Sequence, residues 1–186
     1  RYRDPCWSLA SSDPNVKGRS MTTTYAQKPF PRTVTRTLFL AGPTPREEGI
    51  KKGVRSWRPE ALAYLQDYSP GTHVFVPEAD DGVWRGNYDP QVEWETAALA
   101  RADSIVFWVP REIETMPGFT TNVEFGLHVC SERTFYGRPK DAPKTAFLDF
   151  HAGLRQLPVY DTLEDVLKAA VSAAGAAVRH GPDVMV

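Results

Sequence analysis

Residues 104–126 read SIVFWVPREIETMPGFTTNVEFG, an apolar run followed by a Pro-Gly turn and a segment of helical character. The run at 104–109 is the most apolar stretch of the chain and predicts a buried strand near the centre of a sheet. The residues from 121 to about 132 predict the helix that follows. In α/β sheets, active sites form at the carboxyl ends of such strands, so this junction is the first place to look for chemistry.

Strands alternate with helices on both sides of this stretch. Short apolar runs predict strands and 3.6-residue periodicity predicts helices. The expected strands are 37–41, 73–76, 104–109, 145–148 and 157–160, and the expected helices are 56–68, 89–101, 121–132 and 162–178. The strand at 157–160 is expected at an edge because it contains Pro158. The alternation predicts an α/β fold, a five-stranded parallel sheet of flavodoxin-like (Rossmann-like) type with helices on both faces.

The length of 186 residues and a hydrophobic content of 41% fit one domain with an ordinary core. Residues 1–34 show no periodicity and are expected to form an irregular leader, so the domain is expected over residues 35–186.

The charge and the apolar content exclude several classes of partner. The net charge of −1 leaves no electrostatic footprint for nucleic acid or an anionic membrane. No apolar run is long enough to span a bilayer, and no signal-peptide pattern opens the chain. Cys6 and Cys130 form neither a disulfide framework nor a metal-ligand spacing. We therefore expect a cytoplasmic protein without a metal ion.

Glu95 is the first candidate catalytic residue. On the helix at 89–101 it shares one face with Val92, Leu99 and Ala102, and that face is expected to be buried. A buried carboxylate needs a partner or a role, because its desolvation is costly. The alternative is a half-exposed glutamate at the rim of the sheet, bonded to a neighbouring Arg or Trp N–H.

Glu124 is the second candidate. With Thr121 it forms a capping-box pattern, so the simplest alternative is that Glu124 only caps its own helix. Against that alternative, Gly126 costs about 1 kcal/mol relative to Ala inside a helix and is explained if another group approaches closely. Glu124 also borders an expected apolar face formed by Val123, Leu127 and Cys130.

Two loops are candidates for substrate binding. Gly42, Pro43, Thr44 and Arg46 follow the first strand, where an arginine can meet a sugar hydroxyl, a carboxylate or a phosphate; a tight turn is the alternative. Around the second loop, Trp84, Asn87 and Trp94 offer aromatic rings for stacking on a flat heterocycle, with ordinary packing as the alternative.

Three segments resemble the nucleoside 2-deoxyribosyltransferases and the related nucleotide N-glycosidases. They are FLAGP at 39–43, Trp94-Glu95 with Ala102-Asp103 downstream, and TNVEFG at 121–126, within a resemblance that covers about residues 36–150. The resemblance implies that Glu124 is the nucleophile and that Glu95 is the second carboxylate. It also implies a structural role for Asp103. The family pattern usually has Asp where this chain has Glu95, and the loop before Glu124 is longer than in the N-glycosidases.

The resemblance further implies an activity and its partners. A glutamate attacks the anomeric carbon of a deoxynucleoside, the base leaves, and a second base or water takes the sugar. Glycosidic bonds break through an oxocarbenium-like state that a carboxylate stabilises. The leading hypothesis is transfer of the sugar between nucleobases. The alternatives are hydrolysis of a nucleoside or nucleotide and binding of such a ligand without turnover. A nucleoside or nucleotide and a free nucleobase are the expected partners, no cofactor is expected, and family likeness suggests a homo-oligomer. The expected substrate contacts are Gly42, Pro43, Thr44, Arg46, Trp84, Asn87, Trp94, Thr121 and Asn122.

Overall fold

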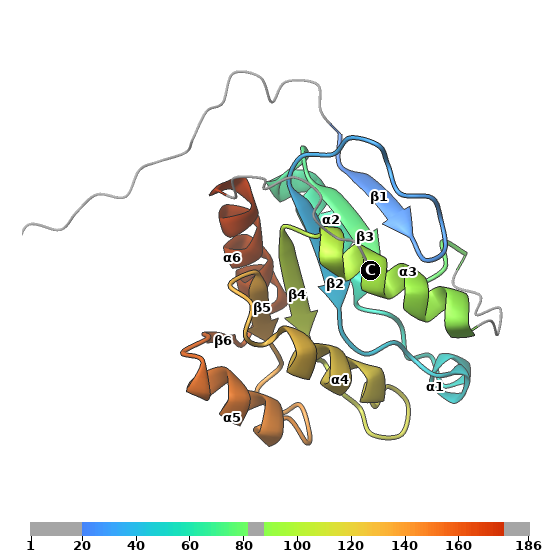
Figure 1. Ribbon diagram of the computed structural model, residues 1–186. Helices are drawn as coiled ribbons and strands as arrows, with labels where there is room; N and C mark the ends of the chain where they lie inside the picture. Colours follow the sequence, from blue (N-terminus) through green and yellow to red (C-terminus); the bar gives the residue numbers. More distant parts are fainter. Residues whose placement is uncertain (1–19, 82–87, 177–186) are drawn as a thin grey trace, which may run out of the picture.

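A computed structural model describes residues 20–81 and 88–176, and these residues form a six-stranded parallel sheet flanked by helices (Figure 1). The strand order is β1-β3-β2-β4-β5-β6. The strands are β1 (Thr22–Tyr25), β2 (Thr37–Ala41), β3 (His73–Val76), β4 (Ser104–Trp108), β5 (Thr134–Gly137) and β6 (Val159–Tyr160). From β3 to β6 this is the flavodoxin-like order, and β1 extends the sheet beyond β3.

The two central strands, β2 and β4, are buried along their whole length. They run parallel, with Phe39 opposite Ile105 and Leu40 opposite Val106. Successive side chains point to opposite faces of the sheet, so each strand supplies residues to two separate cores.

Helices cover both faces, as Figure 1 shows. The helices are α1 (Glu47–Lys51), α2 (Arg58–Tyr68), α3 (Tyr88–Arg101), α4 (Phe119–His128), α5 (Ala146–Leu154) and α6 (Leu163–Ala176). Helices α2 and α6 pack with Leu38, Leu40 and Val106 on one face. Helices α3, α4 and α5 pack with Phe39, Ile105 and Phe107 on the other.

The α/β class, the parallel sheet and the central place of β4 are confirmed. Strands β2 and β3 have the predicted bounds, and β6 lies at the predicted edge. Helices α2, α3 and α6 lie within one or two residues of their expected bounds, apart from the expected end of α6, which lies outside the described residues.

The predicted strand at 145–148 is wrong. These residues begin α5, and the fourth strand of the flavodoxin-like set is β5, about ten residues earlier. A run of only four residues fits either a strand or a helix. The next turn of α5 shows the helical period, because Leu148 and Ala152 are buried whereas Phe147 and Phe150 are exposed.

The sheet has six strands rather than the five predicted. The additional strand is β1, which lies in the stretch 1–34 that was expected to be irregular. Strand β1 pairs in parallel with β3 at the edge of the sheet. Its threonines are held through His73, whose ring lies 2.8 Å (Nδ1) from the Thr22 hydroxyl and 3.1 Å (Nε2) from the Thr24 hydroxyl. A polar strand of this kind has no apolar periodicity to reveal it.

Candidate active site

The loops that follow β2, β3 and β4 meet at one edge of the sheet, because the carboxyl ends of parallel strands point the same way. The loop after β2 begins at Gly42, and the loop after β3 contains Pro77 and Glu78. The loop after β4 leads to Gly118, which precedes α4. Side chains from α2, α3 and α4 converge on this edge.

Gly42 makes the first loop possible. Its φ of 151° lies in a region that L side chains rarely adopt, and a Cβ there would lie 2.2 Å from the Trp108 carbonyl oxygen. The loop is further held by Trp57, whose Nε1 donates to the Pro43 carbonyl at 3.2 Å. The first loop is therefore a tight turn pressed against the end of β4, as one of the two sequence interpretations expects.

Arg58, which the sequence analysis did not single out, lies at the centre of this edge with a relative exposure of only 1%. Its Nε donates to the Leu40 carbonyl at 3.0 Å, and its Nη2 donates to the Gly42 carbonyl at 2.7 Å. Its Nη1 donates to Thr44 Oγ1 at 3.0 Å and to Glu78 Oε1 at 2.6 Å. The guanidinium therefore joins the first loop, the second loop and α2.

A sequence signal for Arg58 does exist. Arg58, Ala61 and Leu65 are the buried residues of α2 and recur at i, i+3 and i+7, the spacing of one helix face. An arginine on that stripe stays buried only if its charge is paired and its donors are bonded.

Glu95 and Glu124 come together from neighbouring helices. Glu95 lies on α3 and Glu124 on α4, both partly buried, and their carboxyl groups interact through a hydrogen bond. Gln91, one turn before Glu95, donates from Nε2 to the Glu95 carboxylate at 2.6 Å and to the Pro77 carbonyl at 3.3 Å. The structure thus brings the two predicted carboxylates into one site.

Burial and mutual repulsion shift the acidity of this pair. Burial, then the charge of Glu95, raises the pKa of Glu124 from 4.5 to about 7, against the opposing charge of Arg58. Burial also raises the pKa of Glu95, while hydrogen bonds from Gln91 and Glu124 and the charge of Arg58 lower it. The pair therefore shares one proton near neutral pH, and Arg58 balances the remaining negative charge.

One sequence interpretation around Glu124 is wrong. Helix α4 begins at Phe119 after Gly118, so Thr121 lies inside the helix and no capping box forms. A Cβ on Gly126 would meet nothing within 4 Å among the described residues, so none of these residues accounts for the glycine.

The expected buried faces of α3 and α4 are also corrected. Val92 has a relative exposure of 39%, because the buried face of α3 runs through Gln91, Trp94, Ala98 and Leu99, with Glu95 at its border. On α4, Val123 and Leu127 are exposed to 63% and 74%, and Cys130 after the helix is exposed. The buried side of α4 is instead formed by Thr121 and Phe125, which places Glu124 at the boundary, facing α3.

The other residues predicted to contact the substrate do not all lie at the carboxylate pair. Thr44 and Arg46 are exposed on the first loop, and the Arg46 guanidinium lies 5.2 Å from the centre of the Phe119 ring. The Trp94 ring is buried, stacks on Phe30 and donates from Nε1 to the Lys28 carbonyl at 2.9 Å, so it is engaged within the chain. Trp84 and Asn87 lie outside the described residues.

Asn122 lies on the opposite side of α4 from Glu124, because two residues correspond to about 200° around a helix. Its Oδ1 accepts a hydrogen bond from Arg111 Nη2, and Arg111 Nη1 donates to the Lys144 carbonyl at 2.7 Å. The structure therefore does not bring Asn122 together with the carboxylate pair.

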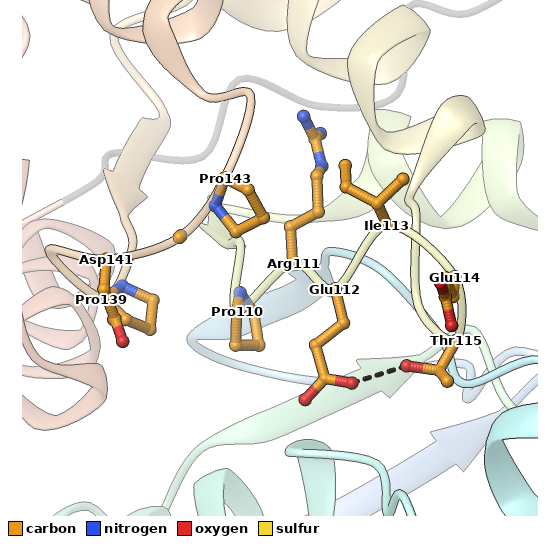
Figure 2. A pocket seen from close by; sticks show the side chains of 10 residues that line it. Pro110, Arg111, Glu112, Ile113, Glu114, Thr115, Pro139, Asp141 and Pro143 are labelled. Carbon is orange, nitrogen blue, oxygen red and sulfur yellow. Dashed lines mark hydrogen bonds between the residues drawn. The ribbon is translucent and has the colours of Figure 1, made fainter.

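Arg111 is also one wall of a hollow of about 550 Å³ between the loop after β4 and the loop at 139–143 (Figure 2). In Figure 2 its guanidinium points away from the hydrogen bond between Glu112 and Thr115. Neither Glu95 nor Glu124 lines this hollow. The candidate active site is therefore the carboxylate pair and not this hollow, because the shifted pKa values and the buried counter-charge are found at the pair.

Among residues 20–81 and 88–176, no three His, Cys, Asp or Glu side chains are grouped so that they could hold a metal ion. Within the same residues, no helix has the length and apolar character that crossing a bilayer requires. Asp103 has the structural role expected of it: its Oδ2 accepts from the backbone N–H and the hydroxyl of Thr37, at 2.7 and 2.8 Å.

Residues 35–142, more than half of the chain, match the model of a protein family described as nucleoside 2-deoxyribosyltransferase like. The matched region includes β2 to β5 and both carboxylates of the site. No curated protein matches the chain.

Proposed function

Because the chain belongs to the nucleoside 2-deoxyribosyltransferase-like family, we propose that it cleaves the N-glycosidic bond of a deoxynucleoside and transfers the sugar to another nucleobase. Glu124 is the nucleophile of the proposal and Glu95 is its acid and base. The observation that carries it is the pair of partly buried, interacting carboxyl groups beside a buried arginine, at the carboxyl ends of the central strands.

The first half of the reaction uses both members of the pair. In the proposed starting state the pair holds one proton, because burial raises the pKa of both carboxyl groups. When the proton moves to Glu95, Glu124 becomes an anion that attacks the anomeric carbon. The bond from that carbon to the base nitrogen breaks, and its electrons leave with the base, which takes the proton from Glu95. The product is a deoxyribosyl ester on Glu124 and an ionised Glu95.

The second half is the reverse of the first with a new base. A nitrogen of the incoming base attacks the anomeric carbon, the ester bond breaks, and Glu124 recovers its negative charge. The N–H proton of the incoming base passes to Glu95, which restores the starting state. A pKa near the working pH suits a group that must give and take a proton in alternate steps.

Arg58 is a positioning residue in this scheme. Its guanidinium donates to four acceptors, one in β2 and three in the first and second loops, and only 1% of its surface is exposed. Its charge favours the ionised forms of Glu95 and Glu124 and so opposes the effect of burial. The exposed Thr44 and Arg46 of the first loop are proposed to contact the sugar end of the substrate.

The test is to incubate the protein with thymidine and adenine and to separate the products by chromatography. We expect deoxyadenosine and thymine from the wild type and from Glu93→Gln, and neither product from Glu124→Ala. Glu93 is the matched control because it is an exposed glutamate on the same helix as Glu95. Intact mass spectrometry after rapid acid quenching should show one added deoxyribosyl group on the wild type and on Glu93→Gln, and none on Glu124→Ala.

Each other result assigns a different activity. Free thymine without deoxyadenosine would mean that water takes the sugar, and the protein would be a hydrolase. No turnover of a panel of nucleosides and nucleotides would overturn the enzymatic proposal. Binding of a nucleoside, seen as a thermal shift that Glu124→Gln preserves, would then favour a binding module.

A further inference from the structure

Gln91 is a buried polar residue beside the carboxylate pair, with a relative exposure of 6%. It lies on α3, one turn before Glu95. Its Nε2 donates to Glu95 Oε1 at 2.6 Å and to the Pro77 carbonyl at 3.3 Å. Its Oε1 accepts from Gln27 Nε2 at 3.3 Å. A buried amide that is bonded through both its nitrogen and its oxygen is held in one orientation.

The Pro77 carbonyl decides which way round the Gln91 amide lies. A carbonyl oxygen can only accept a hydrogen bond, so the group that meets it must be the nitrogen of the amide. The second hydrogen on that nitrogen is directed to Glu95 Oε1. An amide nitrogen cannot accept, so Glu95 Oε1 has to remain an acceptor. A proton on Glu95 is therefore carried by its other carboxyl oxygen.

The Gln91 hydrogen bond favours the ionised form of Glu95. Burial is the largest influence and raises the pKa of Glu95, and the hydrogen bond from Gln91 is the first of the influences that lower it. Among the described residues, the charged groups that act on Glu95 are Glu124 of α4 and Arg58 of α2. Arg58 is itself paired with Glu78 of the second loop. Gln91 therefore stabilises the Glu95 anion without adding a charge to the site.

A short segment that precedes the family-matched region supports this amide from the other side. Residues 26–30 follow β1 and lie next to α3 (Figure 1). The Lys28 carbonyl accepts from Trp94 Nε1 at 2.9 Å, which fastens the segment to α3. Within the segment, Gln27 has a φ of 60°, a left-handed conformation that a residue other than glycine keeps only where its surroundings hold it. This conformation accompanies the hydrogen bond from Gln27 to Gln91.

We propose that Gln91 is a positioning residue that makes Glu95 a stronger proton donor and stabilises its anion while the sugar is bound to Glu124. The inference rests on the proposed function and deepens it. When the leaving base takes the proton from Glu95, the negative charge left behind is met by the N–H of Gln91, and a hydrogen bond to a charged group is stronger than one to a neutral group. Gln91 itself neither gains nor loses a proton.

The first test measures the two carboxyl groups without any substrate. The protein is labelled with ¹³C at the glutamate carboxyl carbons, and the NMR titrations are assigned with Glu95→Gln and Glu124→Gln. In Gln91→Met, which removes the donor and keeps a side chain of similar length, we expect Glu95 to titrate at a higher pH than in the wild type. Gln66→Met is the matched control, because Gln66 is an exposed glutamine on α2, and its titrations should follow the wild type.

Gln27→Met tests the same chain of hydrogen bonds at an exposed residue, so this variant is expected to fold. The Gln27 donor polarises the Gln91 amide, and its removal should move the titration of Glu95 in the same direction by a smaller step. If Gln91→Met does not fold, Gln27→Met decides. An unchanged titration of Glu95 in Gln91→Met, or in Gln27→Met where it decides, would overturn the role of Gln91, whether or not the protein turns over a nucleoside.

The second test uses the reaction itself. Gln91→Met should lower kcat for thymidine by about ten- to a hundredfold, the effect of one hydrogen bond to a charged group, with KM little changed. The loss should be smaller for 5-fluoro-2′-deoxyuridine, whose base leaves more readily as an anion and needs less help from Glu95. Equal losses for both substrates, or a rise in KM alone, would overturn the proposal. If the wild type turns over neither substrate, the proposed function fails, and the titration still decides whether Gln91 controls Glu95.

Discussion

The carboxyl groups of Glu95 and Glu124 meet across the gap between α3 and α4 and share one proton, with Arg58 as their buried counter-charge. Neither carboxylate has this property alone. Burial raises the pKa of both, and the proximity of Glu95 raises the pKa of Glu124 further, to about 7.

The rate of the proposed reaction should fall as the pH rises through about 7, the pKa of Glu124. Above that pH the pair loses its proton and cannot protonate the leaving base, and at low pH both members are protonated and no nucleophile remains. In Glu95→Gln the repulsion is removed, so the pKa of Glu124 should fall and the alkaline limb should disappear with a lower rate. The measurement is kcat/KM against pH, with Glu93→Gln following the wild type. A wild-type profile that stays flat on both sides of neutrality would contradict the shared proton.

Replacing Glu124 with Gln should stabilise the protein above neutral pH. Because folding raises the pKa of Glu124 from 4.5 to about 7, its favourable contribution is present below pH 4.5 and is lost as the pH rises through about 7. At about 1.4 kcal/mol per pKa unit, the variant should gain about 3 kcal/mol near pH 8 and little near pH 4. Urea unfolding at both pH values measures the difference. Equal gains at both pH values would show that the effect has another source.

Removing the guanidinium of Arg58 should destabilise the fold strongly. Arg58→Met leaves Glu78 without its ion pair at 2.6 Å and removes the donors to the Leu40 and Gly42 carbonyls, at a cost of about 3–5 kcal/mol. Arg58→Lys should recover part of this by keeping the charge, but not the forked donation to Leu40 and Gly42. Lys51→Ala is the control, because its ion pair with Glu47 is exposed at both ends and its removal should leave the stability almost unchanged. The denaturant midpoints of the three variants and the wild type measure these differences in stability.

A methyl group at Gly42 should disrupt the first loop. Gly42→Ala places a Cβ against the Trp108 carbonyl oxygen, at a residue whose φ is already unfavourable for alanine, so we expect a loss of about 3 kcal/mol or more. Gly53→Ala is the matched comparison. Gly53 also has a positive φ, but its Cβ would meet nothing within 4 Å, so strain alone should cost about 1 kcal/mol. Melting temperatures of the two variants test whether the close approach to β4 matters; similar values would show that it does not.

The sequence predicted the parts of the fold that have a long or unambiguous period. The apolar runs of β2, β3 and β4 and the helical repeat of α2 and α6 divide inside from outside clearly. The prediction for residues 145–148 failed because a run of four residues fits either period. Strand β1 was missed because Thr22 and Thr24 are held by His73 rather than by an apolar face. Only pairing with the neighbouring strands identifies β1 and β5.

The apolar runs and helical repeats were enough to predict a parallel α/β sheet, a central β4, and a Glu124 that follows β4 where such sheets bind ligands. The fold was needed to show that Glu95 and Glu124 meet, that a buried Arg58 supplies their counter-charge, and that Val123 and Leu127 face outward. The physical reason is that a periodic pattern reports how one segment divides between core and solvent. Which side chains meet depends on how separate helices cross the sheet, and that crossing is set by packing between segments distant in sequence.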